Sequence, residues 1–280
     1  MSVVLEKGYR TKLHWINETT EGTPPSGGTP LPQYKTFYAF VDLRISRPEQ
    51  VQPTIDDRDY SFIELGYKTY DASITYFPHN IELLQESITN VTTNTQTYWF
   101  EYPSISSSVV LSGAKTNRVR LSTEGGNLVQ AVLDVFAAKL TTTAPTANRD
   151  ALPTVAPFHA RDSVVRINST EKPEFRSWSV EISNNLERIP RLGSTEYRVV
   201  RERHRDVTGE LTATFESTAQ LTQLLDNTAF DVEIDIGKEG ATTRKLTITG
   251  CKWLEHPIPS RKTDLILLRL RFRGRTVTLS

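Results

Sequence analysis

SWSVEISNNLERIPRLGSTEYRVVRERHRDVTGELTATFESTAQLTQLLDN, from Ser177 to Asn227, contains the pattern on which the fold of this chain depends. At its start, apolar Trp178, Val180 and Ile182 alternate with polar side chains. A period of two residues places the apolar groups on one face of an extended segment. The stretch therefore begins with a strand that has one buried face.

A second strand and a short helix follow in the same stretch. After a break rich in Asn, Pro and Gly, alternation returns through Leu211, Ala213 and Phe215. The period then lengthens to three and four residues behind Ser and Thr, which are favoured N-cap residues, and this predicts an amphipathic helix over Thr218–Asp226. The unit is strand, long loop, strand and helix.

The same unit occurs earlier in the chain, at a shift of about 137 residues that needs no gap over the two strands. The shift places Val41 on Trp178, Leu43 on Val180, Ile45 on Ile182, Tyr60 on Tyr197 and Ile74 on Leu211. After a small length change in one hairpin it resumes, with Leu111 on Ile248, Gly113 on Gly250, Lys115 on Lys252 and Leu133 on Leu270. These matches predict a tandem duplication of one β-rich domain, in which the first copy has its helix at Asn80–Thr89.

The segments SVEISNNLERIPRLGS, DVTGELTATF and LTITGCKW and the apolar last strand LILLRLRFRGR resemble the tail tube proteins of long-tailed bacterial and archaeal viruses, in their two-domain form. The resemblance covers both copies and rests on strand and turn patterns. It implies a mainly β fold of two tandem β-sandwich or barrel domains, each with one short α-helix. In that family the domains close side by side into rings, and the rings stack as a hollow tube for DNA passage.

The domain boundaries follow from the repeat. The first copy is expected over residues 1–140 and the second over 159–280, with a linker at 141–158. This linker, TTTAPTANRDALPTVAPF, is rich in Thr, Ala and Pro, a composition typical of a semi-rigid connection.

The first copy also carries an insertion of Pro and Gly residues at Glu21–Thr36, which predicts an extended or turning loop. One interpretation is a disordered tip. The other is an arm that contacts a neighbouring ring, since the resembled family uses such extensions for stacking. The expected arm residues are Pro24, Pro25, Gly27, Gly28, Pro30 and Pro32.

Composition excludes several classes of protein. Lys and Arg together number 33, as do Asp and Glu, so the formal net charge of zero does not favour a dedicated nucleic-acid binder. The one cysteine, Cys251, forms no internal disulfide and stands where the first copy has Ala114, which favours a core position. Neither a signal sequence nor an apolar run of ~20 residues occurs, so no membrane anchoring is expected.

Two loops of opposite charge occupy equivalent places before the second strand of each copy. The acidic loop has Asp56, Asp57, Asp59 and Glu64, and the basic loop has Arg198, Arg201, Arg203 and Arg205. A calcium site is disfavoured because the acidic loop lacks the Gly and distal Glu of a calcium-binding loop. Direct DNA contact by the basic loop is disfavoured because aromatic stacking residues do not accompany it. We expect the two loops to meet across subunits or rings.

Side chains that line a tube must come from polar strand faces. The expected lumen-facing residues are Ser73, Thr75, Glu210, Thr212 and Thr214. No catalytic motif, paired metal-ligand spacing or phosphate-binding loop occurs, so we expect neither an enzyme nor a cofactor.

The leading prediction is a structural subunit of a viral tail tube, located in the virion tail and assembled in the host cytoplasm. Its expected partners are itself, a tape-measure protein, tail-end proteins and, transiently, DNA without sequence-specific binding. Two domains per chain predict trimeric rings with six domains around the axis, because ring closure pairs every exposed sheet edge. The alternatives are another ring component, such as a distal tail, tail terminator or secretion-tube protein, and a carbohydrate-binding tandem β-sandwich.

Overall fold

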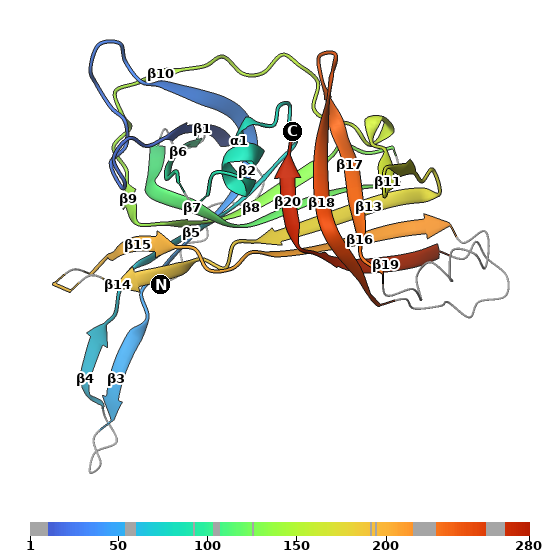
Figure 1. Ribbon diagram of the computed structural model, residues 1–280. Helices are drawn as coiled ribbons and strands as arrows, with labels where there is room; N and C mark the ends of the chain where they lie inside the picture. Colours follow the sequence, from blue (N-terminus) through green and yellow to red (C-terminus); the bar gives the residue numbers. More distant parts are fainter. Residues whose placement is uncertain are drawn as a thin grey trace.

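The computed structural model describes residues 11–53, 60–91, 93–102, 107–124, 126–190, 192–193, 195–214, 228–255 and 267–280. Most of these residues lie in β-strands, and one α-helix and one 3-10 turn accompany them (Figure 1). The expected mainly β architecture is confirmed.

The first half of the chain contains nine strands and the α-helix. They are β1 (Thr11–Asn17), β2 (Gln33–Ser46), β3 (Glu49–Pro53), β4 (Tyr60–Leu65), β5 (Thr69–Tyr76), α1 (Glu82–Ile88), β6 (Gln96–Tyr102), β7 (Ser107–Glu124), β8 (Gln130–Ala137) and β9 (Lys139–Thr141). The rest of the chain contains β10 (Asn148–Arg149), the turn η1 (Ala160–Asp162), β11 (Val165–Ile167), β12 (Thr170–Glu171), β13 (Phe175–Ser183), β14 (Glu187–Pro190), β15 (Tyr197–Arg201), β16 (Asp206–Thr214), β17 (Phe230–Glu239), β18 (Thr242–Glu255), β19 (Leu267–Gly274) and β20 (Thr276–Leu279).

Eight antiparallel strands form one continuous layer through both halves, which we call the central sheet. Their order is β2, β5, β8, β7, β13, β16, β19 and β18. The halves join where β7 pairs with β13, with Arg118 opposite Ser183 and Glu124 opposite Ser177. The two halves therefore share backbone hydrogen bonds as well as a linker.

Strand alternation explains the core. In β5 and β8 every second residue is buried, as the period of two requires. Ile74, Leu121 and Leu133 are fully buried in the first half, as are Leu211 and Phe272 in the second. Burying a side chain of this size stabilises the fold by about 1.5–3 kcal/mol. Further strands pair beyond the central sheet, β1 and β6 in the first half and β11, β17 and β20 in the second.

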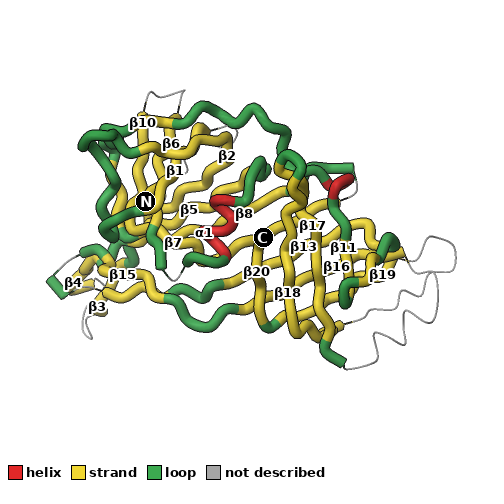
Figure 2. The backbone as a smooth tube through the Cα atoms, turned by 45° about the horizontal axis from the view of Figure 1, so that its top comes forward, coloured by secondary structure: helices red, strands yellow, loops and turns green. Residues whose placement is uncertain are grey.

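The helix predicted at Asn80–Thr89 is confirmed, although its regular part is Glu82–Ile88. Leu83, Leu84 and Ile88 are buried. The helix lies beside β20 of the second half (Figures 1 and 2). The second predicted helix, Thr218–Asp226, lies outside the described residues.

Strand pairing has the same register in the two halves. The shift found in the sequence relates the β2–β5 pairs to the β13–β16 pairs, for example Val41 opposite Ile74 and Trp178 opposite Leu211. It also relates the irregularity between Thr116 and Arg118 in β7 to that between Trp253 and Glu255 in β18.

A left-handed glycine occupies the same place in β7 and β18. Gly113 has φ +60° and Gly250 has φ +64°. A side chain at Gly113 would place Cβ 2.8 Å from the Cβ of Ala138, so both the backbone angle and the space require glycine there.

The Pro/Gly insertion differs from its expected form at its end. Gln33–Thr36 belong to β2, where Tyr34 and Thr36 are buried, so regular structure begins before the insertion was expected to end. Buried side chains at alternate positions outweigh the local Pro/Gly composition. The linker is also tied to this segment, because Asn148 and Arg149 of β10 pair in parallel with Gln33 and Tyr34.

Candidate functional site: the polar face of the central sheet

The five residues expected to face a lumen lie on one face of the central sheet. Residues directly opposite each other on neighbouring strands point to the same side of a sheet. One row of opposite residues crosses the sheet. It starts at Thr75 of β5 and passes through Val132 of β8 and Arg120 of β7. It continues through Glu181 of β13 to Thr208 of β16. Since Ser73 is two residues from Thr75, and Glu210, Thr212 and Thr214 follow Thr208 at intervals of two, all five share this side, which we call the polar face.

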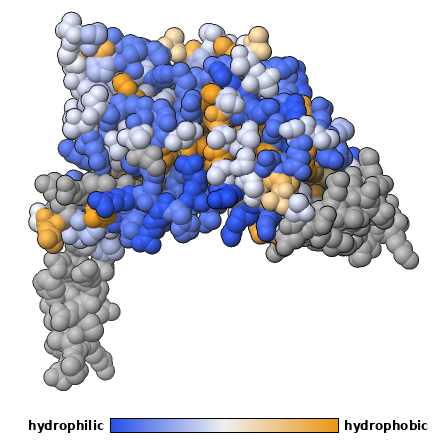
Figure 3. All heavy atoms as spheres, in the orientation of Figure 1, coloured by the Kyte–Doolittle hydropathy of each residue, from blue (hydrophilic) through white to orange (hydrophobic). Residues whose placement is uncertain are grey.

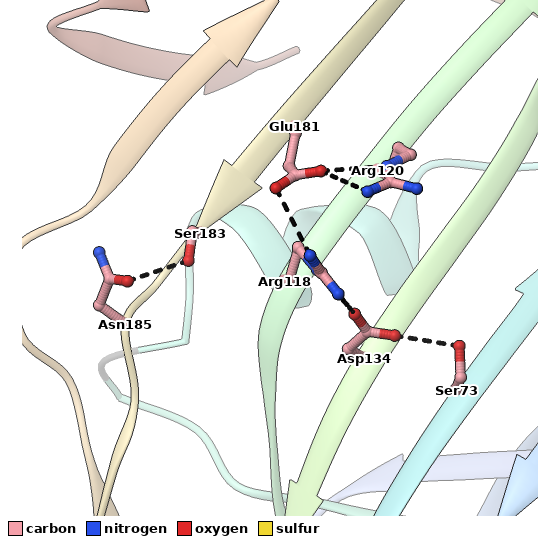
Figure 4. Close-up of polar contacts among 7 residues, drawn as sticks. All are labelled: Ser73, Arg118, Arg120, Asp134, Glu181, Ser183 and Asn185. Carbon is pink, nitrogen blue, oxygen red and sulfur yellow. Dashed lines mark hydrogen bonds and ion pairs between the residues drawn. The ribbon is translucent and has the colours of Figure 1, made fainter.

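A network of charged groups crosses the polar face and links the two halves (Figure 4). Ser73 Oγ donates to Asp134 Oδ1 at 3.0 Å, and Arg118 Nε donates to Asp134 Oδ2 at 2.7 Å. On its other side Arg118 Nη1 lies 3.7 Å from Glu181 Oε1, while Arg120 Nη2 lies 2.6 Å from Glu181 Oε2. The network runs from β5 through β8 and β7 to β13.

The electrostatics of this network keep its arginine side chains paired with carboxylates. The hydrogen bond that Arg118 donates to Asp134 raises the pKa of Arg118, so this guanidinium stays charged and paired. Further along the face, Arg271 Nε lies 3.1 Å from Glu210 Oε2. Exposed pairs of this kind contribute about 0.2–1 kcal/mol each. Their main effect is to leave a face of mixed charge that is already neutralised locally.

The polar face has both signs of charge along its full width. Its described acidic residues are Asp42, Asp71, Glu124, Asp134, Glu181, Asp206 and Glu210. Its described basic residues are Arg44, Lys115, Arg118, Arg120, Lys252, Arg269, Arg271 and Arg273. From the side shown in Figure 3 the surface is mainly hydrophilic, and hydrophobic groups gather near the middle of the view.

The hairpin of β14 and β15 in the second half packs on the first half beside the polar face. The guanidinium of Arg188 lies 3.9 Å from the centre of the Phe136 ring and forms an ion pair with Asp71. The rings of Tyr67 and Tyr197 lie 5.2 Å apart. Sequence reasoning missed Arg188, because its equivalent in the first copy is Val51 and no local pattern marks it.

The structure gives the basic loop partners within its own chain. Arg203 Nη2 lies 2.7 Å from Glu187 Oε2, and Arg205 Nε donates to Asn184 Oδ1 at 3.2 Å. Burial lowers the pKa of Arg205. Arg201 is exposed at the end of β15, and Arg198 also lies in β15.

The acidic loop is described only in part. Asp56, Asp57 and Asp59 lie outside the described residues, and Glu64 lies in β4. The expected contact between the acidic and basic loops therefore stays a prediction.

The expected arm lies along the linker of its own chain. The backbone N–H of Gly27 donates to the carbonyl of Thr146 at 2.7 Å, and the backbone N–H of Thr146 donates to Ser26 Oγ at 2.8 Å. Tyr34 Oη donates to the carbonyl of Pro25 at 3.0 Å. The other arm residues, Gly28, Pro24, Pro30 and Pro32, belong to the same segment between β1 and β2.

Glu18 anchors the beginning of this arm. Its carboxylate accepts hydrogen bonds from the backbone N–H groups of Gly22 at 2.7 Å and Gly113 at 2.8 Å. The hydroxyl groups of Thr95 and Thr97 donate to it at 2.9 and 2.6 Å. Burial raises the pKa of Glu18 despite these donors. No sequence pattern indicates this role, because three of the four donors come from segments distant in the sequence.

Among the described residues, no group of three His, Cys, Asp or Glu side chains is placed to hold a metal ion. The predicted core position of Cys251 is confirmed, since it is fully buried and burial raises its pKa to about 12. No helix in the described ranges is long and apolar enough to cross a membrane.

Comparison with known proteins gives one match, to a protein-family model. The family model described as phage tail tube protein matches residues 8–274, nearly the whole chain. None of the curated proteins compared with the chain matches it.

Proposed function

Because the chain belongs to the phage tail tube protein family, a structural family of the virion tail, we propose that it forms rings that stack into a hollow tube for genome passage. The observation that carries the proposal is the central sheet, which continues through both halves with one register and presents one polar face. Family membership also supports a role without catalysis and disfavours the carbohydrate-binding alternative.

We propose further that the two halves are copies of one domain and that three chains complete a ring. The equal registers and equivalent irregularities support the duplication. The two ends of the central sheet are different strands, β2 and β18, so the contact between chains joins unlike surfaces. Such contacts produce closed rings when the rotation between subunits closes. Two domains per chain then give six domains around the axis of a trimer.

The polar face is the proposed lumen surface. Unpaired Lys and Arg side chains bind DNA phosphates with release of counterions, and this attraction would slow the passage of DNA through the tube. On this face Arg118, Arg120 and Arg271 are engaged by carboxylates. A wall with mixed, locally neutralised charge suits transient contact with DNA and with a tape-measure protein. Tail-end proteins would contact the first and last rings, and assembly would take place in the host cytoplasm.

Negative-stain microscopy of the purified protein tests the proposal. We expect long hollow tubes; isolated rings would identify a terminal ring component instead, and a persistent monomer would contradict a tube role. Substituting Glu210→Ala or Thr212→Ala should leave tubes intact and change the rate of DNA ejection from virions. Loss of tubes in these variants would instead place the polar face at a subunit interface.

A further inference from the structure

We infer that the second half of the chain contains a binding site for a small oxyanion, either a phosphate ion or the carboxylate of an acidic side chain. The site is a cavity between the central sheet and the segment that runs from η1 to the beginning of β13. It lies apart from the polar face, so the inference adds a ligand that the proposed tube role does not require.

The cavity has a volume of about 230 Å³ and is partly open to solvent. Thr123 of β7 and Trp178 of β13 line it on the side of the central sheet, and they lie opposite each other where the two halves join. Each is three residues from a member of the polar face, Arg120 or Glu181, so both side chains point to the other side of the sheet. The segment from η1 to the beginning of β13 lies beside this end of the sheet and forms the rest of the wall (Figure 1). The sheet itself therefore separates the cavity from the proposed lumen surface.

Three polar atoms of the wall have no hydrogen-bond partner in the ranges that the structure describes. They are Nε1 of Trp178, Oγ1 of Thr123 and Oγ of Ser163. Trp178 and Thr123 are only 4% and 8% exposed, so bulk water does not serve them. An indole N–H can only donate, a hydroxyl can donate as well as accept, and a buried donor without an acceptor is unfavourable. The wall therefore lacks a group that supplies acceptor oxygens.

Two cationic side chains line the same cavity. Lys172 and Arg176 both contribute to its wall, and no acidic side chain of the described ranges forms an ion pair with either of them. The register of β11 and β12 places Arg166 opposite Glu171. In the next pair, the backbone N–H of Lys172 donates to the carbonyl of Val165 at 2.9 Å.

The acidic residue of the wall, Glu171, does not neutralise Lys172. Neighbouring pairs of residues point to opposite sides of two paired strands. Lys172 therefore lies on the side of Val165, which is buried and lines the cavity. Glu171 lies on the side of Arg166, which faces away from it.

Three donors and two cations around one cavity favour a ligand with several acceptor oxygens and a negative charge. Phosphate and carboxylate groups have both properties, and their hydrogen bonds with Lys and Arg are shorter and stronger than those between neutral groups. The cavity is several times larger than the ~30 Å³ that one water molecule occupies in the liquid, so a group of the size of phosphate has room. A neutral or cationic ligand would leave Lys172 and Arg176 without a counter-charge.

The first half has apolar residues at the equivalent positions. The shift of about 137 residues places Val41 on Trp178 and Ala39 on Arg176, and both Val41 and Ala39 are buried. The indole donor and one of the two cations are therefore missing there. The inference assigns one site to each chain, in the second half.

Nuclear magnetic resonance of the unassembled full chain, isotopically labelled at the indole nitrogens, tests the site. The chain has four tryptophans, and the indole N–H signal that disappears in Trp178→Phe belongs to Trp178. Inorganic phosphate and, separately, acetate are added at constant ionic strength. We expect one or both to move the Trp178 signal in a saturable way, because its N–H gains an acceptor, while the other three signals stay in place.

Substitutions in the wall measure what each group contributes. Thr123→Val removes a hydroxyl, Lys172→Gln removes a charge, and each should weaken anion binding several-fold. Thr123→Val should not lower the stability of the unliganded subunit, because the hydroxyl that it removes has no partner there. Lys139→Gln, at an exposed lysine of β9, is the matched control and should leave the affinity unchanged.

Assembly distinguishes the two sources of the oxyanion. Equilibrium dialysis measures the retention of whichever labelled anion binds more tightly, before and after the subunits assemble. An anion that stays bound identifies a free ion as the ligand. An anion that is released on assembly identifies an acidic side chain of a neighbouring subunit, which takes its place.

The outcomes separate the inference from the proposed function. If neither anion moves the Trp178 signal, or if Lys172→Gln and the parent protein bind the anion equally well, the inference is wrong and the tube role is unaffected. Failure of the parent protein to form tubes would contradict the tube role, whereas the titration of the unassembled chain would still decide whether the site exists.

Discussion

Glu18 shows how one partly buried carboxylate can organise several segments. It connects the end of β1 with the arm, the beginning of β6 and the bulge of β7 through its four donors. Two of these donors are backbone N–H groups of glycines, and a buried N–H left without an acceptor costs about 1–3 kcal/mol. This side chain therefore helps to position the beginning of the arm.

We predict that Glu18→Ala lowers the free energy of unfolding of the subunit by about 1–3 kcal/mol, because it leaves buried donors unpaired. Glu18→Gln should cost less, because the amide keeps one acceptor oxygen. Denaturant titration of the unassembled subunit measures both. Glu21→Gln, at an exposed position three residues on, is the control and should change stability by less than about 0.5 kcal/mol.

The raised pKa of Glu18 adds a dependence on pH. The folded state binds this proton more tightly than the unfolded state, so stability falls as pH rises from the ordinary pKa of glutamate through the folded-state pKa. The difference in stability between the parent protein and Glu18→Gln should change over this window. A constant difference would show that Glu18 titrates normally.

The β14–β15 hairpin acts as a clamp between the halves. Its Arg188 has a planar side chain that both stacks on Phe136 and pairs with Asp71. Lys115 of β7 lies 3.4 Å from Glu202, just after the hairpin, and both side chains are largely buried. Lysine cannot replace arginine at a stacked site without loss of contact.

We predict that Arg188→Ala destabilises the subunit by about 1–3 kcal/mol, and that Arg188→Lys is intermediate, because it keeps the charge without the stacking. Thermal or denaturant unfolding measures the change. Arg203→Ala removes an exposed pair between Glu187 of this hairpin and Arg203, which follows it, and should cost less than about 1 kcal/mol. Equal effects of the two alanine variants would show that the clamp contributes nothing beyond surface charge.

The sequence predicted the elements better than their ends. Alternating residues such as Trp178, Val180 and Ile182 identify a strand because burial on one face follows directly from the period of two. The predicted end of the Pro/Gly loop, at Thr36, was wrong. The burial of Tyr34 depends on Trp99 and Val110, which are distant in the sequence. Pairing partners such as Arg118 and Asp134 likewise depend on register, which no local pattern specifies.

The candidate site was predictable in part for the same reason. Polar residues at alternate positions indicate a solvated strand face, and the registers place Ser73 and Glu210 on one side of the same sheet. Which partners they meet there required the three-dimensional structure. Arg188 and Glu18 act through contacts between distant segments, so they left no recognisable spacing in the sequence.

The proposed stacking role of the arm can be tested by a deletion that ends before β2 begins at Gln33. Removing residues 23–31 and joining the ends with a short Gly linker should leave folded subunits, since this segment adds no side chain to the described core. If the arm stabilises stacking, tubes of the deletion variant should be shorter and should dissociate at lower denaturant concentration. Tubes of unchanged length and stability would contradict a stacking role.

The arginines of the basic loop have two possible roles. They pair with residues of their own chain, such as Arg203 with Glu187, and they are also expected to select an acidic partner on another chain. Arg203→Glu together with Arg201→Glu should hinder polymerisation if these arginines select an acidic partner on another chain, and added salt should slow assembly of the parent protein. The structure requires a control, because Arg203 already pairs with Glu187. Exchanging the two charges, with Arg203→Glu and Glu187→Arg, restores the pair with the hairpin but keeps the reversed charge at position 203. Light scattering during assembly distinguishes the cases: continued inhibition in the exchanged variant supports a contact between chains, whereas full recovery shows that Arg203 serves only its own hairpin.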